Sequence, residues 1–234
     1  FEQYASTKEE LTEKEEQIYE QLKIKYEESL TKEGLEKNKI AALSYCQLVS
    51  NGPGWLGEDG ESSKELEFRR LFEQELSDEK AIVFTRFKSG IKRLSAILND
   101  LGLKYVQITG DNSIEERRDA RKQFQDMDKD CNVIFITQAG SAAINLQAAG
   151  VILYYDTPWS YGDLYQSIGR AQRIGSIREH ILLLHMVNVK TIDEHVLGIL
   201  DSKKDLINQI VGDIAEGALA FKDDEIIFGD EESS

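Results

Sequence analysis

The sequence predicts an α/β fold, in which a parallel β-sheet carries helices on both faces and is preceded by a helical N-terminal arm. From residue 80 onward, short apolar runs typical of buried parallel strands alternate with longer segments of helical spacing. Such alternation indicates βαβ units and a parallel sheet. Before residue 80, apolar residues recur every three or four positions among charged ones, which indicates amphipathic helices instead.

The first 79 residues are predicted to form helices joined by loops. Ile18 and Leu22 have helical spacing, and Thr12 stands three residues before Glu15, as in a capping box. The run Asn51-Gly52-Pro53-Gly54 is a strong turn signal that ends a helix. We therefore expect helices over 8–30, over about 37–50 and from Ser63 onward.

The sheet begins at Ala81–Phe84, an apolar run with the composition of a buried strand. The helix expected after it, Ser89–Leu101, is followed by Gly102, a residue typical of helix C-caps. The later expected elements are strand 104–109, helix 113–125, strand 132–137, a small-residue helix 139–148, strand 150–155, helix 161–171, strand 180–187 and a helix from Thr191. We assign residues 1–79 to the arm, 80–205 to the sheet domain, and 206–234 to a helix end and a disordered acidic tail.

The charge of the chain is unevenly distributed. The net charge is −15, yet residues 80–122 hold ten basic and five acidic residues. This pattern argues against indiscriminate nucleic-acid binding but permits a local phosphate-facing patch. No apolar run approaches the length of a membrane span, and no signal peptide is evident. With two widely separated cysteines, the chain is expected in a reducing compartment, either bacterial cytoplasm or, in a eukaryote, the nucleus.

Functional residues are expected at one edge of the predicted sheet. In an open parallel sheet, ligands bind beyond the carboxyl ends of the strands. The corresponding loops follow residues 84, 109, 137, 156 and 187.

The strongest functional pattern is the segment Gln166–Gly175. On a helix, Gln166, Arg170 and Arg173 project from one face, and no acid stands four residues from either arginine. Two guanidinium groups on one face favour an anion, and their planar geometry suits phosphate oxygens. The alternative, a solvated helix face, is disfavoured by the glycines that flank the pair and by the position between two expected strands.

This segment resembles motif VI of the superfamily-two helicases, and its neighbours narrow the resemblance to the Swi/Snf-like DNA translocases. The further matching stretches, in order, are 81–87 (motif IV), 105–113 with Arg117 behind it, 137–146 (motif V), 156–160 (the Asp-x-x-Trp before motif VI) and 191–196 with Lys203-Lys204. The resemblance implies a RecA-like sheet, the second lobe of a two-lobed motor that hydrolyses ATP on double-stranded DNA.

The resemblance also implies roles for individual residues. Arg173, and with it Arg170, would act as the arginine finger. The nucleotide side of the cleft would be lined by Gln166, Gly140 and Asn145. The opposite mouth would hold the DNA backbone through Thr85, Arg86, Gly110, Arg117 and Thr137. ATP and Mg²⁺ would be held mainly by the N-terminal lobe of the same protein. We expect no metal site in this chain, because its three histidines show no ligand spacing with either cysteine.

Two departures from the family pattern indicate a divergent branch, bacterial or from a phage. Motif V has Gly140-Ser141-Ala142-Ala143 where the family has Gly-Gly-x-Gly, and motif VI has Gln172 where the family has histidine. The chain contains no Gly-Lys dipeptide and so no phosphate-binding P-loop. We therefore expect this chain alone to be inactive as an ATP hydrolase.

Several alternatives stay open. The motor could belong to a strand-separating DNA or RNA helicase, or the chain could be a non-catalytic interaction domain with a helicase-like fold. Asp193-Glu194-His195 is similar to a DExH box, but it has no apolar strand before it, so we interpret it as structural. Trp159 is interpreted as a packing anchor rather than a ligand-stacking residue.

Overall fold

The computed structural model describes residues 2–30, 44, 46–52, 61–128, 130–137, 145–171 and 180–204. The chain divides into one compact unit, Phe1–Val196, and a second, Leu197–Ser234. The described part of the second unit, residues 197–204, is helical. None of the helices in these ranges is long and apolar enough to cross a membrane. The predicted domain boundaries after residues 79 and 205 stay predictions.

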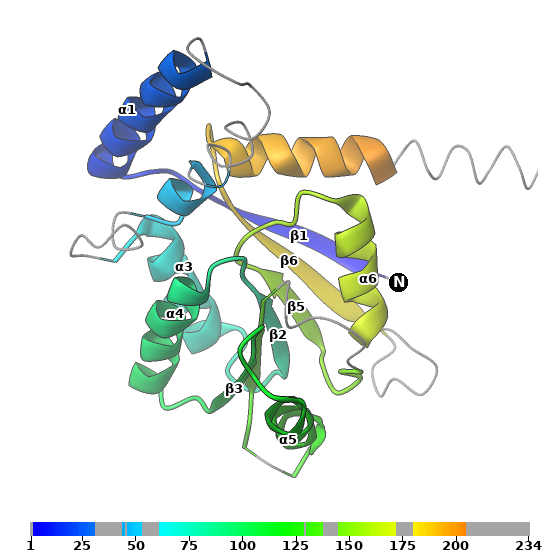
Figure 1. Cartoon of the computed structure of the whole chain (residues 1–234). Coiled ribbons are helices and arrows are strands. Elements are labelled where there is room, and N and C mark those ends of the chain that lie inside the picture. Colours follow the sequence, from blue (N-terminus) through cyan, green and yellow to red (C-terminus); the bar gives the residue numbers. More distant parts are fainter. Residues whose placement is uncertain are drawn as a thin grey trace, which may run out of the picture. The chain divides into compact units, whose positions relative to one another are not determined.

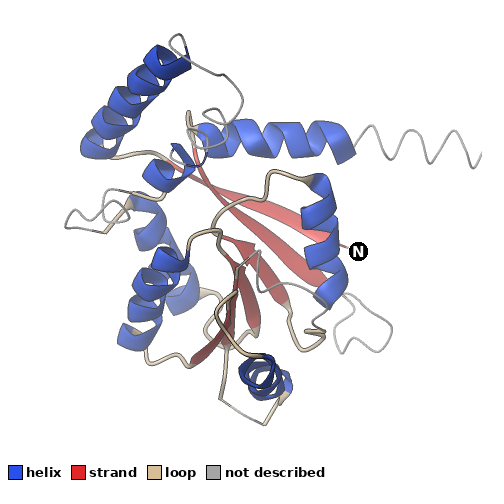
Figure 2. Cartoon of the chain, viewed as in Figure 1, coloured by secondary structure: helices blue, strands red, loops and turns tan. Residues whose placement is uncertain are grey.

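The first unit is built on a six-stranded sheet in which every neighbouring pair is parallel (Figures 1 and 2). In sheet order the strands are β1 (Glu2–Glu9), β6 (Ile181–Asn188), β5 (Val151–Tyr154), β2 (Ala81–Phe84), β4 (Val133–Ile136) and β3 (Tyr105–Ile108). Phe84 pairs with Ile136 on one side and Tyr154 on the other, so the carboxyl ends of the central strands are level. The predicted parallel sheet is confirmed.

Helices cover both faces of this sheet. They are α3 (Ser63–Gln74), α4 (Lys88–Asp100), α5 (Ile114–Gln125) and α6 (Tyr161–Ala171), and α1 (Glu13–Leu30) precedes them in the chain. Figure 1 shows α3 and α4 on one side of the sheet and α6 on the other. The helices predicted at 113–125 and 161–171 are therefore confirmed to within a residue of their bounds.

Alternation along the strands explains the two-sided packing. Ala81 and Val83 of β2 belong to the core beneath α3 and α4, together with Phe68 and Leu94 of those helices. On the opposite face, the hydroxyl of Tyr154 lies 2.5 Å from Oγ of Ser167 in α6. Each fully buried large apolar side chain contributes about 1.5–3 kcal/mol, which is why strands of four residues suffice here.

Local signals set the helix ends as the sequence indicates. The Thr12–Glu15 capping box is present, with Thr12 N–H donating to Glu15 Oε2 at 2.8 Å. Gly102, directly after the C-cap of α4, has a φ of +71°. This left-handed conformation is one that glycine adopts without steric cost.

Two parts of the secondary structure differ from the prediction. No strand was predicted in residues 2–9, yet β1 pairs with β6 at the sheet edge. The helix predicted over 8–30 therefore begins only at Glu13. The predicted helix 139–148 is wrong over residues 145–148, which are not helical and end in a turn at 147–148, and residues 139–144 lie outside the described residues. The reason lies in tertiary contacts, because Leu146 N–H donates to the carbonyl of Arg170 at 2.9 Å.

Candidate functional site

The site starts where β2 and β5 end side by side. Asp156, two residues beyond β5, is buried, and its Oδ2 accepts hydrogen bonds from Thr85 Oγ1 at 2.6 Å and from Arg86 N–H at 3.0 Å. Burial raises the pKa of the Asp156 carboxyl, whereas Lys64 and these hydrogen bonds lower it. The carboxylate thus ties the turn after β2 to the end of β5.

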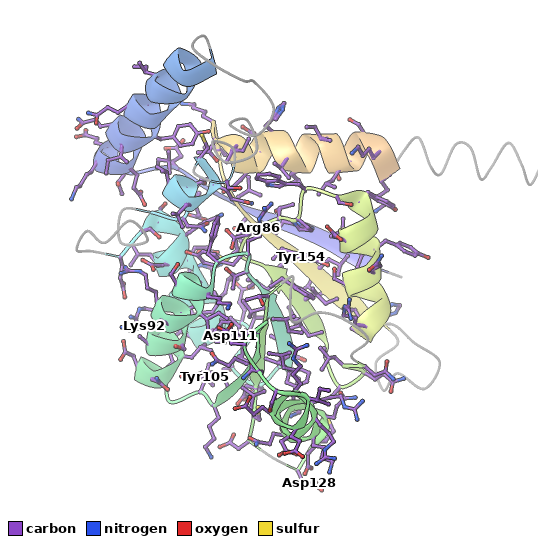
Figure 3. The ribbon with its side chains drawn as sticks, viewed as in Figure 1. Arg86, Lys92, Tyr105, Asp111, Asp128 and Tyr154 are labelled. Atoms are coloured by element: carbon purple, nitrogen blue, oxygen red, sulfur yellow. The ribbon has the colours of Figure 1, made fainter. Side chains whose placement is uncertain are left out.

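Arg86 lies on the indole of Trp159. Its guanidinium carbon is 3.9 Å from the ring centroid, a cation–π stack that contributes about 0.5–2 kcal/mol. Burial lowers the pKa of Arg86, and Asp156 and Asp163 oppose that effect. A guanidinium stays charged in proteins, so a cation lies at this edge of the sheet. Figure 3 labels Arg86 and Tyr154, which lie near each other at the ends of β2 and β5.

Helix α6 supplies the other wall. Its start is set by Ser160, whose Oγ accepts from Asp163 N–H at 3.4 Å and whose carbonyl accepts from Leu164 N–H at 3.1 Å. Asp163 in the first turn and Arg170 in the last have the charges that suit the helix dipole. Gln166 and Arg170, one turn apart, share a face as predicted.

These elements enclose a pocket of about 280 Å³. Its lining residues are Phe84, Thr85, Arg86, Tyr154, Asp156, Pro158, Trp159, Ser160, Asp163, Gln166, Ser167 and Arg170. It holds two guanidinium groups, one amide and the carboxylates of Asp156 and Asp163. The Asp156 oxygens already accept hydrogen bonds from Asn51, Thr85 and the Arg86 backbone. The guanidinium and amide groups are the donors that suit the oxygens of an anionic ligand.

The structure brings together residues that were predicted to lie on opposite mouths of a cleft. Thr85 and Arg86, assigned to DNA, line the same pocket as Gln166 and Arg170, assigned to the nucleotide. The cause is the sheet order, since β2 and β5 are neighbours and α6 directly follows β5. Asn145 lies near the end of α6, because its neighbour Leu146 bonds to the Arg170 carbonyl.

Gly110 and Arg117 form a separate turn after β3. Arg117 Nε donates to the carbonyl of Asn112 at 3.0 Å, and its Nη2 donates to that of Gly110 at 3.3 Å. Asn112 in turn accepts from Thr109 N–H at 2.7 Å. Arg117 therefore holds the shape of this turn and leaves Gly110 exposed.

The other predicted residues have mixed outcomes. Thr137, directly after β4, is buried, and its Oγ1 has no hydrogen-bond partner in the described part of the chain. Arg173 and Gly140 lie outside the described residues. No group of three or more potential metal ligands was found among the residues described.

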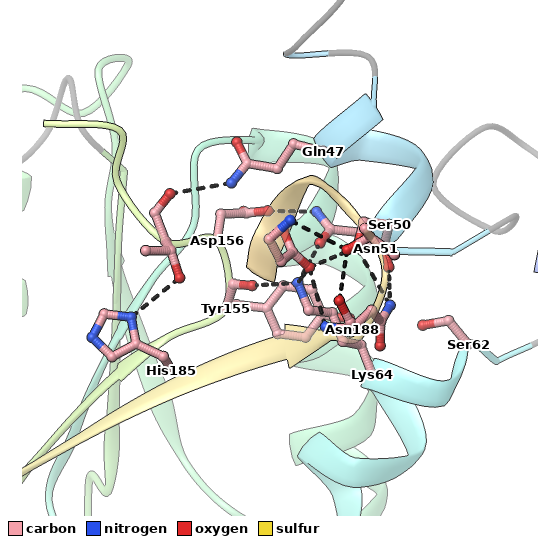
Figure 4. Close-up of polar contacts among 12 residues, drawn as sticks. Gln47, Ser50, Asn51, Ser62, Lys64, Tyr155, Asp156, His185 and Asn188 are labelled. Carbon is pink, nitrogen blue, oxygen red and sulfur yellow. Dashed lines mark hydrogen bonds and ion pairs between the residues drawn. The ribbon is translucent and has the colours of Figure 1, made fainter. Parts of the chain in front are cut away.

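Sequence reasoning missed two residues, Asn51 and Lys64. Lys64 is fully buried, and its Nζ lies 2.7 Å from Oδ2 of Asp193 (Figure 4). The structural interpretation of Asp193 is supported by this ion pair. No local signal identifies the pair, because a lysine in the first turn of an amphipathic helix is usually a surface residue.

Comparison with known proteins identifies the family of residues 63–175. Residues 63–175 match the helicase conserved C-terminal domain. This segment is a helicase C-terminal domain. It contains the whole pocket lining and every predicted site residue.

Several curated relatives of this helicase domain are named ATP-dependent helicases. The fission yeast (Schizosaccharomyces pombe) ATP-dependent helicase fft2 is 30% identical over 52% of the chain, and the Bacillus subtilis uncharacterized ATP-dependent helicase YqhH is 30% identical over 58%. The SWI/SNF chromatin-remodeling complex subunit snf22 of Schizosaccharomyces pombe is 28% identical over 58%. The chain spans only 9%, 24% and 8% of these proteins.

Solved structures share the fold. The Sulfolobus solfataricus SWI2/SNF2 ATPase C-terminal domain is 19% identical, with a TM-score of 0.70 and 90% of each chain covered. The SWI2/SNF2 ATPase core from the same organism in complex with dsDNA is 21% identical, with a TM-score of 0.74, 90% of this chain and 46% of that chain covered. The helicase domain therefore has the RecA-like fold of the C-terminal lobe of SWI2/SNF2 ATPases.

Proposed function

We propose that this chain is the second motor lobe of an ATP-dependent translocase on double-stranded DNA. The observation that carries the proposal is the pocket in which Gln166 and Arg170 of motif VI meet Arg86 at the carboxyl edge of the sheet. Its guanidinium and amide donors suit phosphate oxygens, which both ATP and a DNA backbone present. The relatedness to ATP-dependent helicases supports the same proposal.

Different residues of this chain would take part in ATP hydrolysis and in DNA binding. ATP with Mg²⁺, held mainly by a P-loop lobe, supplies the phosphoryl group that is transferred to water. Arg173, together with Arg170, would stabilise the charge that develops on that group, a contribution of about 10³–10⁵ in rate for an arginine finger. Arg86 and the Gly110 turn would bind DNA phosphates, so binding would be insensitive to sequence and sensitive to salt.

The test is DNA-stimulated ATP hydrolysis by the 234-residue chain mixed with a separately produced P-loop lobe. We expect activity only in the mixture and its loss in Arg173→Ala. Arg69→Ala is the matched control, because Arg69 of α3 pairs with Glu61 and Asp100, away from the pocket. Hydrolysis by the chain alone, or a mixture as active with Arg173→Ala as without it, contradicts the proposal.

A strand-displacement assay on the same mixture separates translocation from unwinding. The Asp156-x-x-Trp159 signature and the helix that begins at Thr191 resemble translocases that leave the duplex paired. We therefore expect hydrolysis without release of a labelled strand. Release that depends on ATP would assign the chain to a strand-separating helicase.

A further inference from the structure

A buried polar network joins the arm to the pocket (Figure 4). Its central members, Asn51, Lys64, Asp156 and Asp193, are each at most 2% exposed. They come from the turn after the 46–50 helix, from α3, from the end of β5 and from the segment after β6. Asn51 lies outside the segment matched by the helicase family, and Lys64 at its very start.

Asp156 connects the two sides of this network through its two oxygens. Oδ1 accepts a hydrogen bond from Asn51 Nδ2 at 2.6 Å. Oδ2 accepts those from Thr85 and Arg86 described above. One carboxylate therefore holds the arm with one oxygen and the pocket-lining turn with the other.

Lys64 determines which way Asn51 points. An ammonium group has three donors, and those of Lys64 meet Asn51 Oδ1 at 3.2 Å, the Tyr155 carbonyl at 3.0 Å and Asp193 Oδ2 at 2.7 Å. Because lysine can only donate, it fixes the amide oxygen of Asn51 toward itself. The amide nitrogen is thereby directed at Asp156.

This series of contacts leads to the Arg86 guanidinium in the pocket. The turn that Asp156 holds at Thr85 and Arg86 delivers the Arg86 guanidinium onto Trp159. Without the Asn51 donor, Asp156 would lose the hydrogen bond that orients one of its oxygens in a buried site. A buried carboxylate left partly unsatisfied rearranges or takes up a proton, and either change disturbs the Arg86 turn.

We propose that Asn51 and Lys64 are positioning residues for Arg86, acting through Asp156. The segment that precedes the helicase domain is then part of the site rather than a passive linker. The inference rests on the proposed function only in so far as Arg86 binds DNA. The positioning of Arg86 on Trp159 does not depend on that function and can be measured without DNA.

An exchange of the two interacting groups tests the contact directly. Asn51→Asp alone places a carboxylate oxygen 2.6 Å from an oxygen of Asp156. Asp156→Asn alone removes the carboxylate that accepts the hydrogen bond from the Asn51 amide. In the double variant the carboxylate now at position 51 accepts from the amide now at position 156. The oxygen of that amide still accepts from the Thr85 turn, and Lys64 still donates to position 51. The double variant also keeps the net charge of the chain.

The first readout is the NMR resonance of the Trp159 indole N–H in the full 234-residue chain, with Trp55→Phe to leave a single tryptophan. We expect Arg86→Ala to shift this resonance, each single exchange to shift it in the same direction, and the double exchange to restore it. Folded single variants with the resonance of the parent would overturn the proposal. So would a double variant that stays shifted.

The second readout is affinity for a labelled DNA duplex at fixed salt. We expect each single exchange to weaken binding about tenfold, as loss of one arginine–phosphate contact does, and the double exchange to recover it. If Arg86→Ala leaves affinity unchanged while the resonance behaves as expected, the DNA role of Arg86 fails and the positioning stands. Should Asn51→Asp not fold, Asn51→Ser removes the amide without adding charge, and an unshifted resonance in it counts against the proposal.

Discussion

The guanidinium carbon of Arg86 lies 3.9 Å from the centroid of the Trp159 ring. No carboxylate in the described part of the chain forms a salt bridge with this guanidinium, which is held instead by the aromatic face and by the turn that Asp156 fixes. A cation held in this way keeps its in-plane donors for a ligand. Trp159 is both a packing anchor and the support of a charged group, whereas sequence alone indicated only the first.

Replacing Arg86 tests this arrangement. We expect Arg86→Ala to weaken binding to duplex DNA by about tenfold and to reduce the slope of log K against log salt by about 1, since one phosphate contact is lost. The measurement is fluorescence anisotropy across a salt series. Lys104→Ala is the control, because Lys104 pairs with Asp130 at the start of β3 and carries the same charge. An equal loss in both variants would indicate only a net-charge effect.

Replacing Lys64 tests the buried ion pair. Lys64→Met leaves Asp193 as an uncompensated buried charge, so we expect the free energy of unfolding to fall by about 3–5 kcal/mol. Lys92→Met, on the exposed face of α4, is expected to change it by less than about 0.5 kcal/mol. Adding Asp193→Asn to Lys64→Met should recover part of the loss. Urea unfolding measures all three, and a Lys64→Met protein as stable as the parent would contradict the ion-pair argument.

The sequence predicted those parts of the fold whose signals are local. The strands Ala81–Phe84 and Val133–Ile136 are uniformly apolar because both faces of a parallel sheet are covered, and such runs are readable without a structure. β1 was not predicted, because an edge strand needs little apolar surface and its sequence EQYASTKE is mostly polar. The non-helical segment 145–148 was not predicted, because a hydrogen bond from Leu146 to α6 overrides the helix propensity of its small residues.

The candidate site also has a part that local sequence spacing predicts and a part that it does not. Gln166 and Arg170 are one helical turn apart, so their common face follows from spacing alone. The network at Asp156 does not, because its contacts join residues 105 positions apart at Asn51 and 71 positions apart at Thr85. Pairings over such distances depend on the strand order, which the sequence pattern left open.

Gly52 is predicted to be the less replaceable of two left-handed glycines. Its φ is +113°, and an added Cβ would lie 2.1 Å from Cβ of Ser62, the N-cap of α3. Gly102 has a φ of +71° with nothing within 4 Å of an added Cβ. We expect Gly102→Ala to cost only backbone strain, about 1–2 kcal/mol, and Gly52→Ala to cost more because α3 must shift. Thermal unfolding of the two variants compares them, and equal losses would show that the contact with Ser62 is unimportant.

His185 is predicted to make the protein less stable in mild acid. Its ring is fully buried, stacks on Tyr154 with centroids 4.6 Å apart, and has Nδ1 3.1 Å from Thr157 Oγ1. Burial lowers the pKa of His185 to about 3 from its usual 6.5. Between these values the unfolded chain binds a proton that the folded chain does not, so the free energy of unfolding falls as the pH falls below about 6.5.

Comparison with His185→Gln isolates this effect from the other titrating groups. From about pH 7 to about pH 5 the parent should lose about 2 kcal/mol more than the variant, since each pKa unit corresponds to about 1.4 kcal/mol. The variant itself should be less stable than the parent at neutral pH, because glutamine cannot reproduce the ring stack on Tyr154. The measurement is urea unfolding at both pH values. Parallel losses in the two proteins would mean that His185 takes up its proton equally in the folded and unfolded states, which a neutral buried ring does not allow.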